Sequence, residues 1–105
     1  METLIRLLLV EAGLGPVTLH IQVSCGGFPY RIDLGYPALR LGIEADGRAV
    51  HGSADAVLND RRRQSALLAA GWLILRFTWD DVVDRPDYVV SAVRQAISQS
   101  SGRAS

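Results

Sequence analysis

Two short alternating segments joined at a proline constrain the fold of this chain more than any other feature. YRIDLGY, residues 30–36, and LRLGIEAD, residues 39–46, both have the apolar and β-branched composition of strands, and the short turn between them contains Pro37. Two such segments separated by so few residues predict a β-hairpin. The hairpin in turn fixes which side chains lie next to each other.

A turn centred between Ala38 and Leu39 places Asp33 directly opposite Glu44. Because side chains alternate along a strand, Asp46 falls on the same face as these two acids. The opposite face is predicted to be the core side of the hairpin and carries Ile32, Leu34, Leu41, Ile43 and Ala45. The hairpin therefore separates an apolar face from a face with three carboxylates.

Like charges directly opposed across two strands are destabilising, because their Cβ atoms are only about 5 Å apart. The repulsion between Asp33, Glu44 and Asp46 can be offset in three ways: by a bound divalent cation, by a raised pKa on one carboxyl, or by arginine neighbours such as Arg31. The sequence leaves these alternatives open.

Carboxylate oxygens are the ligands preferred by Mg²⁺ or Mn²⁺, which bind substrate phosphate in their remaining positions. His51 follows Asp46 by five residues, within reach of the same site, and a histidine can relay a proton at neutral pH. The acids and His51 together predict phosphoryl chemistry. The simpler alternative is a solvated acidic face and a loop histidine without a function.

The remaining patterns predict the order αβββαβα. Helices are expected over residues 2–12, from an N-cap at Ser53 to Ala70, and from Pro86 onward, and further strands over residues 17–23 and 72–78. This is an α+β fold, an α/β/α sandwich in which helices flank a small mixed sheet. We expect a single domain over residues 1–98 and a disordered tail over residues 99–105.

The composition of the 105-residue chain limits the partners and the chemistry that it can have. The formal net charge is zero, so attraction to nucleic acid has to come from local clusters of basic residues. No apolar run is long enough to span a bilayer, and the single cysteine, Cys25, suits a reducing compartment, so we expect a cytoplasmic protein without membrane contact. Lysine is absent, which excludes lysine-based catalysis.

Four arginines are candidates for contacts with nucleic acid. Arg61, Arg62 and Arg63 form a run on the second helix, where a run of charges is more often a solvated face. Arg76 interrupts an apolar strand, from which it could reach the acids or a phosphate, although a satisfied edge arginine is an equally good explanation. His20 alternates with core residues, and we interpret it as structural or inert.

The run YRIDLGYPALRLGIEADGRAVHG, the ND-RRR helix and the segment GWLILRFTWDDV together resemble the bacterial domain-of-unknown-function 559 family. That family is related to the very-short-patch-repair endonucleases within the PD-(D/E)XK nuclease superfamily. The resemblance covers nearly the whole chain and implies a restriction-endonuclease-like αβββαβ core with a central mixed sheet.

Carried over by position, the resemblance makes Asp33 the metal-binding aspartate and Glu44 the acid of the second motif. Asp46 stands where the superfamily usually has a lysine, and His51 matches the histidine that acts as a general acid or base. Glu2 lies where many members carry a further acid on the first helix. The absence of lysine departs from the pattern, and so does the lack of enough cysteine and histidine for the zinc site of the repair enzymes.

The resemblance and the residues together predict a Mg²⁺- or Mn²⁺-dependent DNA endonuclease. Its catalytic residues would be Asp33, Glu44, Asp46 and His51, the first three holding the metal, and Arg61, Arg62, Arg63 and Arg76 would bind the nucleic acid. The alternative is a catalytically inactive nuclease fold that binds nucleic acid or protein in a toxin–antitoxin or defence system. Many single-domain nucleases cut duplexes as dimers, so a homodimer is a candidate assembly.

Overall fold

The computed structural model describes residues 1–46 and 53–104. The helices of this part are α1 (Glu2–Glu11), α2 (Ala54–Ala69), α3 (Trp79–Asp84) and α4 (Pro86–Ala104), with a short 3-10 turn, η1, at Pro37–Leu39. The strands are β1 (Thr18–Cys25), β2 (Phe28–Tyr36), β3 (Leu41–Asp46) and β4 (Leu73–Thr78). The predicted order is therefore confirmed, with α3 as an addition.

The four strands form one mixed sheet in the order β1-β2-β3-β4. β2 and β3 pair antiparallel through Leu34 with Ile43 and Tyr36 with Leu41, which is the predicted hairpin register. β3 and β4 pair parallel, and α2 lies between them in the chain, as a parallel connection requires. The parallel pairing places Arg76 beside Glu44.

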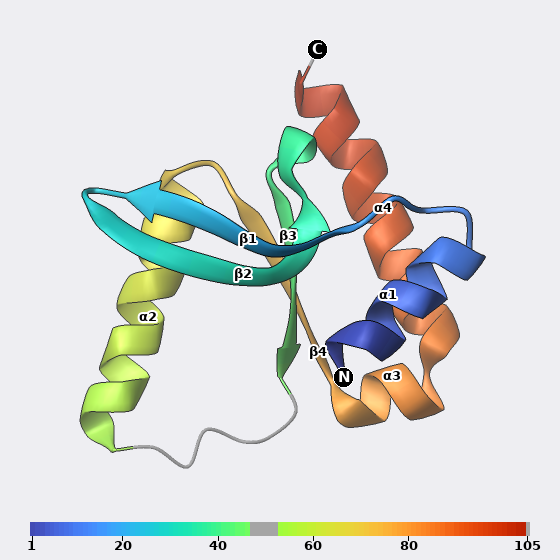
Figure 1. Ribbon diagram of the computed structural model, residues 1–105, viewed down its shortest axis with the longest axis horizontal. Helices are drawn as coiled ribbons and strands as arrows, with labels where there is room; N and C mark the ends of the chain where they lie inside the picture. The colour runs from blue at the N-terminus through green and yellow to red at the C-terminus, as the bar shows by residue number, and fades with distance from the viewer. Residues whose placement is uncertain (47–52, 105) are drawn as a thin grey trace.

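Helices cover both faces of the sheet (Figure 1). On one face, α1, α3 and α4 pack on a core that is built around Ile5, Leu34 and Phe77. On the other face, α2 packs through Leu67 on a smaller core that includes Trp72. This three-layer arrangement confirms the predicted α/β/α fold.

The β1–β2 ribbon changes faces along its length, which the alternation of its residues did not predict. Leu34 belongs to the core under α1 and α4, whereas Ile32 belongs to the core under α2, together with Ile21. The prediction that Ile32 shares the core face of Leu34 is therefore wrong. His20, opposite this point on β1, has a φ of +52°, in the left-handed region that interrupts a regular strand.

The ends of the helices follow local capping chemistry. The Ser53 hydroxyl accepts from the Ala56 N–H at 3.3 Å, which confirms the predicted N-cap of α2. Thr78 and Asp81 form a capping box that begins α3, a helix that the sequence analysis missed although the T-x-x-D pattern is present. α4 continues to Ala104, which corrects the tail predicted from residue 99. Within the described ranges, no helix is both long and apolar enough to cross a membrane.

Candidate functional site

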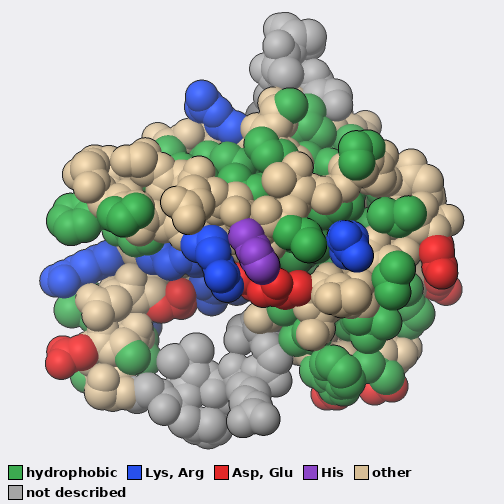
Figure 2. Space-filling model, viewed as in Figure 1, with side chains coloured by type: hydrophobic (Ala, Val, Ile, Leu, Met, Phe, Trp, Pro, Cys, Tyr) green, Lys and Arg blue, Asp and Glu red, His purple; other side chains and the backbone are tan. Residues whose placement is uncertain are grey.

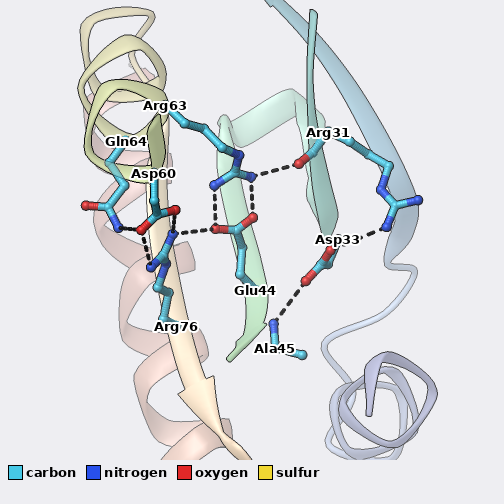
Figure 3. Close-up of polar contacts among 8 residues, drawn as sticks. All are labelled: Arg31, Asp33, Glu44, Ala45, Asp60, Arg63, Gln64 and Arg76. Carbon is cyan, nitrogen blue, oxygen red and sulfur yellow. Dashed lines mark hydrogen bonds and ion pairs between the residues drawn. The ribbon is translucent and has the colours of Figure 1, made fainter. Parts of the chain in front are cut away.

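Glu44 is buried, with a relative exposure of 8%, and it is more buried than Asp33. It lies in the middle of β3, and its carboxylate accepts two hydrogen bonds from Arg63 of α2, one of them from Nη1 to Oε1 at 2.8 Å and the other from Nη2 to Oε2 (Figure 3). The same guanidinium donates from Nη2 to the carbonyl of Arg31 at 2.7 Å. A planar guanidinium suits this two-point contact with a carboxylate, so Arg63 ties α2 to both strands of the hairpin.

A second arginine reaches Glu44 from the neighbouring strand. Arg76 Nη2 lies 3.4 Å from Glu44 Oε1 and 2.9 Å from Asp60 Oδ1, and its Nη1 donates to Asp60 Oδ2 at 3.2 Å (Figure 3). The hydrogen bond from Arg76 lowers the pKa of the Asp60 carboxyl, against a smaller opposing effect of burial. Glu44 and Asp60 therefore balance the charges of Arg63 and Arg76.

Asp33 has a different environment from Glu44, although the hairpin register places the two side by side. Its Oδ2 accepts from the Ala45 N–H at 3.1 Å, and Figure 3 shows this oxygen directed at Ala45, whereas the Glu44 carboxylate is directed at Arg63. Arg31 is its nearest cation, with Nη2 at 3.9 Å from Oδ1. Burial raises the pKa of Asp33, and the nearby carboxyls of Glu2 and Glu44 raise it further, whereas the bond from Ala45 lowers it.

The other two predicted catalytic residues, Asp46 and His51, have side chains that lie outside the described part of the structure. Asp46 ends β3, where its backbone is described, whereas His51 lies wholly outside that part. Among the side chains that are described, no group of three or more histidine, cysteine or acidic residues converges as metal ligands would. Asp33 fits a cation such as Mg²⁺ as a carboxylate donor, whereas Glu44 does not in this arrangement, because both of its oxygens accept from arginine.

Two residues outside the predicted catalytic set join Asp33. The Glu2 carboxyl at the start of α1 lies close enough to raise the pKa of Asp33, and His20 Nε2 lies 3.1 Å from Glu2 Oε2. The position of Glu2 agrees with the acid that the family resemblance placed on the first helix. His20, which we interpreted as structural or inert, had no sequence signal, because the contact joins residues 18 positions apart.

The four arginines that were predicted to bind nucleic acid divide into two pairs. Arg61 and Arg62 are exposed on α2, whereas Arg63 and Arg76 are partly buried against acids, with side-chain exposures of 19% and 28%. Figure 2 shows a hollow between α2 and the β1–β2 ribbon, with basic side chains along its edge and acidic ones beside them. A nucleic-acid role for these arginines stays a prediction.

A mixed sheet with helices on both faces and acids on adjacent strands is the architecture of the restriction endonuclease-like class of proteins. The chain belongs to the REase_MTES_1575 family, whose model matches residues 2–97. Its fold is similar to that of the catalytic domain of the homing endonuclease I-Bth0305I, with a TM-score of 0.73 and 22% identity, and the alignment covers 94% of each chain.

Two uncharacterized proteins of Mycobacterium tuberculosis, from strains CDC 1551 and H37Rv, are each 27% identical to this chain over 101 residues. The matched region covers 95% of this chain and 37% of each relative. The chain thus spans well under half the length of these relatives.

Proposed function

We propose that this protein is a nuclease that hydrolyses phosphodiester bonds in DNA at a site centred on Asp33. The observation that carries the proposal is the half-buried Asp33 carboxyl, held by the Ala45 N–H beside Glu2 and Glu44. Membership of a restriction endonuclease-like family supports the reaction class, and the fold shared with a homing endonuclease catalytic domain supports DNA as the substrate. The narrower relation to the domain-of-unknown-function 559 and repair-endonuclease families stays a prediction.

Asp33 would act as an anionic oxygen ligand at the scissile phosphate. Mg²⁺ or Mn²⁺, held by Asp33 and, as the sequence predicts, by Asp46, would supply a Lewis acid that stabilises the charge developing on the phosphate. The Ala45 N–H orients the Asp33 carboxylate, because it donates to Oδ2 and leaves Oδ1 for other contacts. His51 keeps its predicted role as the group that transfers a proton.

For Glu44 we propose a positioning role in place of the predicted metal ligation. Its carboxylate offsets the charges of Arg63 and Arg76, and it fixes α2 relative to β3 and β4. Releasing Glu44 to a metal would leave two partly buried guanidinium groups with fewer anionic partners, which is costly. Arg61 and Arg62, exposed on the same helix, are then the residues that would contact the phosphate backbone.

The test is nicking of supercoiled plasmid in the presence of Mg²⁺ or Mn²⁺. We expect nicking by the natural protein, its loss with EDTA and its loss in Asp33→Asn, a substitution that retains an oxygen acceptor for the Ala45 N–H. Asp55→Asn, which removes an exposed aspartate from the first turn of α2, serves as the matched control and should nick normally. Equal nicking by the natural protein and Asp33→Asn, or none by the natural protein at high concentration, would count against the proposal.

One observation favours a second candidate function, an inactive nuclease fold that binds nucleic acid or protein. Both Glu44 oxygens accept from arginine, an arrangement that suits a structural anchor as well as a catalytic scaffold. This candidate predicts DNA binding that is unaffected by EDTA and by Asp33→Asn, together with no cleavage. Heat stabilisation by divalent ions that disappears in Asp33→Asn would favour the nuclease instead, because an ion bound to the folded state raises its stability.

A further inference from the structure

His20, Glu2 and Asp33 form a chain of contacts between three elements that are far apart in the sequence. His20 comes from β1, Glu2 from the first turn of α1, and Asp33 from β2. The His20 ring contacts Glu2 at 3.1 Å, and the Glu2 carboxyl in turn lies close enough to Asp33 to raise the pKa of its carboxyl. Figure 2 shows a histidine directly against acidic side chains on the face drawn there.

The backbone fixes where the His20 side chain lies. Leu19 pairs with Leu34 and Ile21 with Ile32, so His20 is opposite Asp33 in the register of the ribbon. Its φ of +52° lies at the point where the ribbon passes from one core to the other. A residue other than glycine is uncommon in this conformation, and such positions are concentrated at functional sites.

We propose that His20 is a positioning residue for the hydrolysis proposed above, acting on Asp33 through Glu2. The inference rests on the proposed function, because it assigns His20 a part in presenting the Asp33 carboxylate to the phosphate. Glu2 is at the start of a helix and has a side-chain exposure of 32%, so without a partner it is restrained only by the helix backbone. The ring of His20 restrains the end of the Glu2 side chain, and Glu2 in turn limits the orientations of Asp33.

The experiment is a single-turnover cleavage assay on a DNA duplex with saturating protein. The test variant is His20→Gly, since glycine accepts a positive φ and the change removes the imidazole together with Cβ. Gln22→Gly, at an exposed position of the same strand, is the matched control for the added flexibility. We expect the cleavage rate of His20→Gly to fall about tenfold or more with DNA affinity unchanged, as a misplaced catalytic group would cause. Added imidazole should restore part of the rate, and Gln22→Gly should match the natural protein.

Coupling to Glu2 distinguishes positioning from a general loss of structure. In a Glu2→Ala background, the further change His20→Gly should leave the rate unchanged, because the contact is already gone. A rate for His20→Gly within twofold of the natural protein, or an equal fall in both backgrounds, overturns the proposal.

A second readout does not depend on cleavage. The side-chain carboxyl carbon of Asp33, observed by NMR, should shift in His20→Gly and stay in place in Gln22→Gly. If the natural protein does not cut DNA, the proposed nuclease fails while this shift still tests the contact chain. An unmoved Asp33 signal overturns the positioning of Asp33 by His20 in either case.

Discussion

Replacing Arg63 by methionine should destabilise the fold by about 2–3 kcal/mol. The change leaves Arg76, at 3.4 Å, as the arginine that still contacts Glu44, whose relative exposure is only 8%. We assign about 1–2 kcal/mol to the loss of Arg63, below the 3–5 kcal/mol of a fully buried broken pair. The change also removes the donor to the Arg31 carbonyl at 2.7 Å, which contributes about 1 kcal/mol. Methionine keeps most of the apolar stem, so lost packing adds little.

The assay is urea unfolding, with thermal melting as a second measure. For a domain of this size, a loss of 2–3 kcal/mol lowers Tm by about 10–20 °C. Arg62→Met is the matched control, since Arg62 is the exposed neighbour on the same helix, and it should change stability by less than about 0.5 kcal/mol. In the double variant Glu44→Gln/Arg63→Met the two losses should fall short of additivity by about 1 kcal/mol. Equal stabilities of Arg63→Met and Arg62→Met would refute the anchoring role.

Three further predictions test the packing and the charges around this site. Gly42→Ala should cost about 1–3 kcal/mol in urea unfolding, because an added Cβ would lie 2.6 Å from Ile74 Cδ1 and 2.7 Å from Ile32 Cγ2; a neutral result would show that this core can yield. Tyr36→Phe should cost about 1 kcal/mol in urea unfolding, because it loses the hydrogen bond to the Leu14 carbonyl at 2.7 Å. Burial raises the pKa of Tyr36 to about 12, so its phenol should ionise only near that pH in an absorbance titration, and ionisation at the ordinary value of 10.0 would contradict its burial. The lowered pKa of Asp60 means that its contribution to stability is present above its usual value of 3.8 and is lost as the pH falls through the folded value, so the stability difference between the natural protein and Asp60→Asn should shrink in acid; a difference that is constant with pH would contradict the pairing with Arg76.

The hairpin was predictable because its turn and its register are local. The segment around Pro37 is short, so the position of the turn fixes the register of the two strands. The predicted turn gave the observed pairing of Leu34 with Ile43. The same local reasoning failed for Ile32, because alternation assumes a regular strand and His20 on the partner strand adopts a positive φ. Periodicity within one segment carries no information about an irregularity in another.

The partners of the acids could be predicted only in part. The sequence analysis left arginine neighbours open as one way to offset the repulsion around Glu44, and it named Arg31. It also gave Arg76 as a residue that could reach the acids, and the strand pairing of β3 with β4 places it beside Glu44. The structure adds Arg63, because α2 packs on the sheet beside β3. Helix packing of this kind is a tertiary contact that no spacing in the sequence shows. The contact between His20 and Glu2 was missed for the same reason.

The central claim is that Asp33 takes part in phosphodiester hydrolysis, and the most direct measurement separates cleavage from binding. It compares single-turnover cleavage of an end-labelled DNA duplex by the natural protein and by Asp33→Asn, with the bound fraction of duplex measured in the same solutions. We predict that Asp33→Asn binds as well as the natural protein and cuts at least about a hundredfold more slowly. Equal cleavage rates, or firm binding by the natural protein with no cleavage in Mg²⁺ or Mn²⁺, would contradict the account.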